Sequence, residues 1–237
     1  MQPTFQFQET SLVPITEPFS PVLINPEFCK HSGIIPKDWE LLKEPTYTPQ
    51  MVQFSYQNGV TLTAQSNRIL LTELIQEQNL GGSEIAEVAQ KLVQSLPNLH
   101  YDAIGFNPLG HAVLSEESEA TRQYLNQTLL APGPWQEVGQ APVRSRITFT
   151  YTLERGQLSL TVNEAGLRNE EEKVTPVVLF SGNFSYPITG SSQPERTESL
   201  MQILSYWQSD LEQFQAIVNE TFLAKVGNQP MLLPVFT

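Results

Sequence analysis

The sequence has little of three things: cysteine, positive charge and uninterrupted apolar sequence. Only one of its 237 residues is cysteine, Cys29, so no disulfide can form within the chain. This favours a reducing compartment, and we expect a soluble cytoplasmic protein. The longest apolar runs, 177–180 and 231–236, are far shorter than the roughly 20 residues that cross a bilayer. The first residues lack a basic start followed by an apolar run, so we expect no signal peptide.

Positive charge is scarce as well. Lysine and arginine number 13 against 25 acidic residues, which gives a formal net charge of −12. The closest basic pair is Arg144 and Arg146, too sparse for the clustered phosphate contacts of a nucleic-acid-binding protein. An anionic membrane surface is disfavoured for the same reason. Charged residues make up only 16% of the chain, and Gln, Thr and Ser fill the polar surface instead.

Proline is plentiful only at the start. Residues 1–50 contain eight of the 18 prolines, which favours extended backbone, with one strand expected at 4–13. The same stretch carries many large apolar side chains, among them Phe5, Phe28 and Trp39. A flexible linker would not carry so many, and we therefore expect an extended arm packed on the body of the protein.

The next 80 residues show a hairpin, a strand and a helix. Apolar residues alternate over 52–56 and 60–64, and Asn58-Gly59 between them predicts a tight turn with two positive φ angles. A strand at 68–74 follows. Apolar residues at helical spacing predict a helix over 84–96 with Ser83 as its N-cap. This half is completed by a strand at 101–106, which Asn107-Pro108 is expected to end, and by a helix at 116–130.

A similar order follows the Pro/Gly break at 131–134. Alternation over 147–153 and 158–162 predicts a second hairpin, and a strand is expected at 177–184. An apolar stripe from Leu200 to Phe222 then predicts one long helix of roughly six turns, from about residue 195 to a point before Gly227.

These elements predict an α+β fold. We expect an antiparallel twisted sheet built from two hairpin–strand–helix halves, with helices packed on one face and a long C-terminal helix. The expected parts are the arm at 1–50, the first half at 51–130 and the second half at 141–237, joined in one compact domain. The order suggests a duplication, although few residues are identical between the halves.

One stretch resembles known sequences. The chain resembles a group of uncharacterised bacterial proteins of similar length at residues 52–62, at Asn67-Arg68-Ile69, in the helix that follows and in the strand 101–107. The resemblance covers about residues 50–110. It implies a soluble bacterial α+β protein and carries over no catalytic residue, cofactor or partner.

The search for catalytic chemistry gives few candidates. Cys29 and His31 are two possible metal ligands where a zinc site needs three or four, so we expect no metal and no cofactor. Cys29 with His111 or His100 and an aspartate could form a triad only if the fold brought them together. The Gly81-Gly82-Ser83 turn lacks a basic neighbour for phosphate, and the acidic clusters at 116–119 and 170–172 fit solvated surface. The binding candidates are Asn107, His111, Arg144 and Arg146, since loops after strands often carry function.

Three functions stay open. The leading hypothesis is a non-enzymatic interaction or assembly protein, with a protein partner or self-association through a sheet face, an exposed edge or the arm. The second is a carrier of a small apolar ligand held in a pocket between a helix and the sheet. The third is a hydrolase-type enzyme using Cys29, His111 or the acidic clusters.

Overall fold

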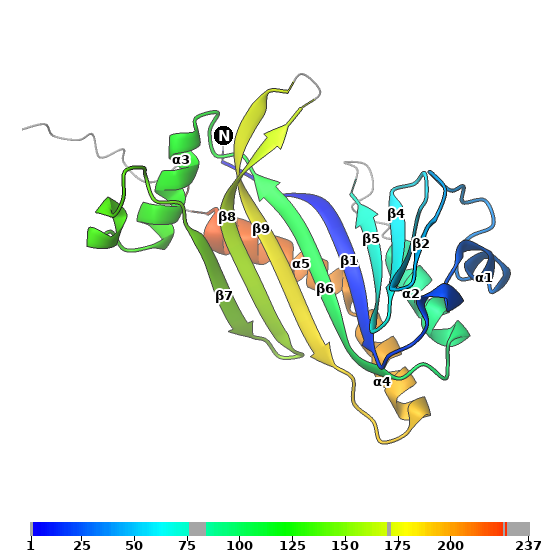
Figure 1. Cartoon of the computed structure of the whole chain (residues 1–237). Helices are drawn as coiled ribbons and strands as arrows, with labels where there is room; N and C mark the ends of the chain where they lie inside the picture. The colour runs from blue at the N-terminus through cyan, green and yellow to red at the C-terminus, as the bar shows by residue number, and fades with distance from the viewer. Residues whose placement is uncertain (1, 76–83, 170–171, 225, 227–237) are drawn as a thin grey trace, which may run out of the picture.

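Nine strands of the computed structural model form one antiparallel sheet, in the order β2-β3-β4-β5-β1-β6-β9-β8-β7 (Figure 1). The structure describes residues 2–75, 84–169, 172–224 and 226. The strands are β1 (Gln6–Thr16), β2 (Thr46–Thr48), β3 (Met51–Ser55), β4 (Val60–Gln65), β5 (Arg68–Leu74), β6 (Tyr101–Ala112), β7 (Arg146–Thr152), β8 (Gln157–Arg168) and β9 (Val174–Pro187). The helices are α1 (Pro26–His31), α2 (Glu84–Ser95), α3 (Ser118–Gln123), α4 (Gln193–Leu204) and α5 (Trp207–Ala216), with short turns η1 (Pro21–Leu23) and η3 (Pro134–Glu137) and π-helical turns η2 (Tyr124–Leu129) and η4 (Ile217–Phe222).

The proline-rich start of the chain supplies the middle of the sheet. The strand expected at 4–13 is β1, and it pairs antiparallel with β5 on one side and β6 on the other. Leu12 lies opposite both Leu71 and Phe106, and all three side chains are buried. After β1, Asn25 caps α1 by accepting a hydrogen bond from the backbone N–H of Phe28.

Helices α2, α4 and α5 lie on one face of the sheet, behind it in Figure 1. Ring contacts join this layer to the strands: Trp207 lies 5.4 Å from Phe106, and Phe214 lies 6.5 Å from Phe184, between ring centroids. The α+β class predicted from the sequence is therefore confirmed. The stripe predicted for α2 is also confirmed, because its buried residues are Ile85, Val88, Ala89, Leu92 and Val93.

The stripe near the C-terminus forms several helical segments where one long helix was expected. Helices α4 and α5 are separated at Ser205-Tyr206, and η4 follows α5. At the break the hydroxyl of Ser205 donates to the carbonyl of Gln202 at 2.6 Å, a side-chain bond that competes with helix continuation. The prediction of two similar halves stays a prediction, since β1 stands between the two sets of strands in a single sheet.

Two turn predictions need correction. At Asn58-Gly59 only Gly59 has a positive φ, of 90°, and Asn58 instead accepts a hydrogen bond from the N–H of Val60 through its side chain. The second correction concerns Asn107-Pro108, which does not end a strand: β6 continues through both residues to Ala112. Neither Asn107 nor Pro108 has a paired residue on β9, so the missing N–H of proline is tolerated there. Gly182 of β9 leaves space for two rings, because a Cβ on it would lie 2.6 Å from the ring of Phe214 and 2.9 Å from Cγ of Pro108.

The sheet face opposite the helices is lined with small polar side chains. They hydrogen-bond in pairs across neighbouring strands: Gln53 with Thr63, Thr61 with Ser55, Asn107 with Ser11 and Asn183, and Thr148 with Thr161. Uncharged polar side chains thus pair with one another across this face of the sheet.

Gly110 marks the closest approach of β6 to the start of the chain. A Cβ on Gly110 would overlap the backbone oxygen of Gln6 and the ring of Phe5. We expect Gly110→Ala to lower the free energy of unfolding by about 2–3 kcal/mol, measured by urea denaturation. Gly166→Ala is the control, because its Cβ would meet only the movable side chain of exposed Val174. Equal stability of both variants would contradict this packing.

Candidate functional site

The four candidate residues do not meet in one cleft. Asn107 and His111 lie on β6, Arg146 begins β7, and Arg144 precedes it. The register places His111 opposite Leu179, Leu179 opposite Asn163, and Asn163 opposite Arg146. His111 and Arg146 thus share a row across the sheet but stand three strand spacings apart, about 14 Å.

Asn107 and His111 have structural surroundings. The side chain of Asn107 donates to Ser11 at 3.2 Å and accepts from Asn183 at 2.5 Å, so it links three strands. His111 is only 8% exposed, and its Nδ1 has no hydrogen-bond partner among the described residues. Burial lowers the pKa of His111, which keeps the imidazole neutral.

The remaining chemical candidates are also separate. Cys29 is completely buried on α1, and burial raises the pKa of its thiol to about 12, which removes its nucleophilic form. His31 lies on the surface with Nδ1 2.8 Å from the carbonyl oxygen of Glu27. In the described ranges, no three His, Cys, Asp or Glu side chains are placed to hold a metal. The Gly81–Ser83 turn and Glu170-Glu171 lie outside the described residues.

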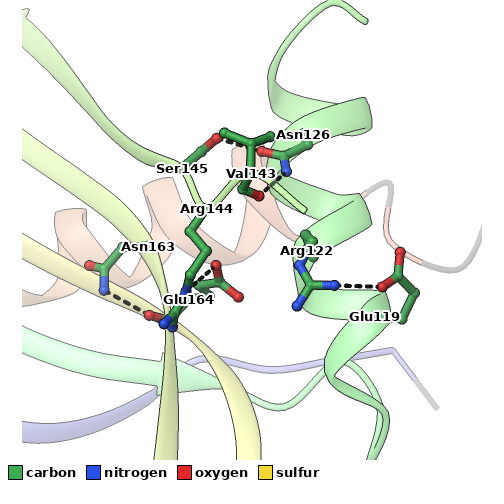
Figure 2. A network of polar contacts seen from close by, with 8 residues as sticks. All are labelled: Glu119, Arg122, Asn126, Val143, Arg144, Ser145, Asn163 and Glu164. Carbon is green, nitrogen blue, oxygen red and sulfur yellow. Dashed lines mark hydrogen bonds and ion pairs between the residues drawn. The ribbon is translucent and has the colours of Figure 1, made fainter. Parts of the chain in front are cut away.

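Arg144 borders a cavity of about 460 Å³ between α3 and the ends of β8 and β9. Its Nε donates to the carboxylate of Glu164 at 2.8 Å, while Arg122 across the cavity pairs with Glu119 at 2.8 Å (Figure 2). Both guanidinium groups therefore already have a carboxylate partner. The charged residues that line the cavity, Glu116, Glu164, Arg122 and Arg144, balance in charge.

The same network fixes the start of β7. Asn126 of η2 donates through its side chain to the carbonyl of Val143 at 3.0 Å and accepts from the hydroxyl of Ser145 at 2.5 Å (Figure 2). Asn126 is itself buried, and its backbone carbonyl accepts from Gln136 at 2.7 Å. The two residues on either side of Arg144 are thus tied to η2, and the chain enters β7 in a fixed position.

A second anchor holds the other end of β7. The turn after it contains Arg155, whose guanidinium donates to the carboxylate of Asp210 on α5 at 2.6 Å and lies 4.3 Å over the ring of Tyr206. Asp210 is 1% exposed and also accepts from the hydroxyl of Tyr186 on β9 at 2.7 Å. Burial raises the pKa of Asp210, and both hydrogen bonds act against this rise by stabilising the charged form.

Between its anchors β7 is an edge strand with one free side. It pairs with β8 only, and no described residue pairs with its outer edge, at the left of Figure 1. The turn is closed by a hydrogen bond from Leu153 N–H to the Gly156 carbonyl. Because antiparallel bonding alternates, residues 147, 149 and 151 bond to β8, while the N–H and C=O groups of residues 146, 148, 150 and 152 point outward.

The side chains of β7 are suited to pairing. Thr148 and Thr150 lie exposed on the polar face, and Ile147, Phe149 and Tyr151 lie half-buried on the helix face. Phe149 packs on Phe222, at 5.2 Å between ring centroids. The backbone carbonyl of Phe222 accepts from the buried hydroxyl of Tyr124 on η2 at 3.0 Å. Side chains of this β-branched and aromatic kind favour strand pairing.

The opposite edge of the sheet is protected. Strand β2 has three residues and lies between Pro45 and Pro49. Short edge strands and flanking prolines are common devices against edge-to-edge association. Strand β7 has seven residues and contains no proline, lysine or bulge. The contrast marks the edge of β7 as the candidate functional site.

The sequence predicted this strand but not its role. Alternation over 147–153 identified it correctly, and two binding candidates lie at its beginning, Arg144 just before the strand and Arg146 as its first residue. The roles of Asn126 and Arg155 as anchors were missed, because no local pattern indicates the residues that they bond in the fold. The edge position could not be predicted, since it depends on which strands pair in the folded sheet.

His111 gives a test of the buried neutral imidazole. Its pKa is lowered in the folded state, so the unfolded chain takes up a proton first as the pH falls below about 6.5. We expect the free energy of unfolding of the wild type to fall between pH 7 and pH 5, and that of His111→Gln to fall less over the same range. Urea denaturation at each pH measures both. Parallel curves for both proteins would contradict a buried, neutral His111.

Comparison with known proteins gives no assignment. No protein-family model and no curated protein matches this sequence. No helix in the described ranges is both long and apolar enough to span a membrane. The function is therefore inferred from the chain's own residues.

Proposed function

We propose that this protein is a non-enzymatic interaction or assembly protein that binds a partner protein by strand addition along β7. The observation that carries the proposal is the contrast between the two edges of the sheet. The outer edge of β7 is long and unprotected, whereas the opposite edge strand, β2, is short and flanked by prolines. In strand addition the main chain of the partner supplies hydrogen bonds and its alternate side chains supply specificity.

The two anchors support this function because they lower the entropy lost on binding. Asn126 holds the entry to β7, and the Arg155–Asp210 pair holds its exit. Phe149 rests on Phe222 between them. A strand already fixed in its paired conformation does not have to be ordered when the partner arrives, and such preorganisation increases affinity.

The other two hypotheses receive less support. For a hydrolase, Cys29 and His111 lie on separate elements, and neither lines the two cavities that border Arg122. For a carrier, the space between α4, α5 and the sheet holds packed side chains such as Trp207 and Phe214. An apolar cavity of about 360 Å³ beside Trp39 and Tyr56 lies elsewhere, between α1 and the end of β3.

Thr150→Pro tests strand addition directly. The N–H of Thr150 points outward, so proline removes a group that only a partner strand can use, and it leaves the bonds to β8 in place. We expect Thr150→Pro to reduce capture of the partner from native-host extract by at least tenfold while the circular dichroism spectrum stays unchanged.

Thr150→Val is the matched control. It keeps the backbone N–H and a β-branched side chain, and it should retain the partner in the same capture experiment. Equal capture by wild type, Thr150→Pro and Thr150→Val would contradict the proposed role of β7, because binding would then not depend on its outward backbone groups.

A further inference from the structure

We infer that the strand added to β7 is β7 of a second copy of this chain, paired antiparallel about a two-fold axis through Phe149. This inference rests on the proposed function and names its partner. It predicts a dimer in which two nine-stranded sheets continue into one another along the free edge at the left of Figure 1.

The sequence of β7 matches itself when reversed about Phe149. Thr148 would lie opposite the partner's Thr150, and Ile147 opposite the partner's Tyr151. The threonines would meet on the polar face and the apolar side chains on the helix face, because directly opposite residues in a sheet point to the same side. The two inner rows thus pair side chains of similar character, and the outermost row pairs Arg146 with the partner's Thr152.

The backbone pattern agrees with the same register. The outward groups belong to residues 146, 148, 150 and 152. With the axis at Phe149, residue 146 meets the partner's 152 and residue 148 meets the partner's 150. Every outward N–H and C=O of the strand then faces another outward group, and no other centre on β7 pairs all four.

Charge complementarity favours a second copy over an unrelated strand. Arg144 and Glu154 are both exposed and equidistant from Phe149, so each Arg144 would lie beside the partner's Glu154 at the end of the ladder. Arg144 is 74% exposed and bonds to Glu164 through Nε, which leaves its two terminal nitrogens for a second carboxylate. These contacts also offset part of the repulsion between two chains of net charge −12.

Cysteine cross-linking tests the register. Thr148 and Thr150 are both exposed, so each can be replaced by a reactive cysteine, in the variants Thr148→Cys and Thr150→Cys. The natural Cys29 is buried and its thiol stays protonated, so the wild type serves as the unreactive control. Directly opposite residues lie about 5.5 Å apart between Cα atoms, within disulfide range, whereas diagonal ones lie about 7–8 Å apart. We expect a mixture of the two variants, distinguished by a tag, to form a disulfide-linked heterodimer under mild oxidation, at least tenfold faster than either variant alone.

Charge reversal tests the ends of the ladder. Glu154→Arg would place an arginine beside the partner's Arg144 at both ends, and we expect the dimer dissociation constant to rise about tenfold in sedimentation equilibrium. Glu198→Arg on α4 makes the same change in net charge far along the sequence from β7, and Glu198 is exposed. Because it only reduces overall repulsion, Glu198→Arg should leave the dimer unchanged or slightly tighter.

The outcomes separate this inference from the proposed function. A purified full-length chain that sediments at twice 26.6 kDa, with both variant results above, supports the dimer. A chain that remains monomeric at about 100 µM overturns it, and rapid cross-linking of Thr148→Cys alone overturns the register. If the chain is monomeric and Thr150→Pro still abolishes capture of a different protein, strand addition stands and the second copy is excluded.

Discussion

The pairing of β1 with both β5 and β6 is the constraint on which the rest of the structure depends. Without β1, the strands β2 to β5 and the strands β6 to β9 would have no shared hydrogen bonds. Its inward side chains, such as Leu12, also complete the surface against which α2, α4 and α5 pack. A segment rich in proline can fill this position because its prolines fall mostly after β1 and because Pro14 faces Ile104 without interrupting the ladder.

The sequence was informative wherever periodicity was strong. The two hairpins, the strand at 68–74 and the apolar stripe of α2 were predicted at nearly their observed positions, since local alternation reports which face of an element is buried. Predictions failed where one specific contact overrode the periodic pattern. Pro108 looked like a strand end, but β6 continues through it, with Gly182 opposite it on β9 leaving space for the ring. Ser205 interrupts a stripe that reads as continuous.

The candidate site was less predictable than the fold for a related reason. An edge strand and an inner strand have the same alternation, and only the order of strands separates them. Each anchor joins residues that are far apart in the sequence. Asn126 bonds to Ser145, 19 positions away, and Arg155 bonds to Asp210, 55 positions away. Such polar contacts have no periodic signature. Composition did carry one useful signal, because abundant Thr, Ser and Gln correspond to the uncharged side-chain pairs on the polar face of the sheet.

The short, proline-flanked β2 also sets the size of any assembly built on this sheet. A sheet with two open edges can stack end to end without limit, which produces filaments. Here the far edge offers three residues between Pro45 and Pro49. Whatever chain pairs with β7, growth in the other direction is disfavoured at β2, so assembly through this sheet is expected to stay finite.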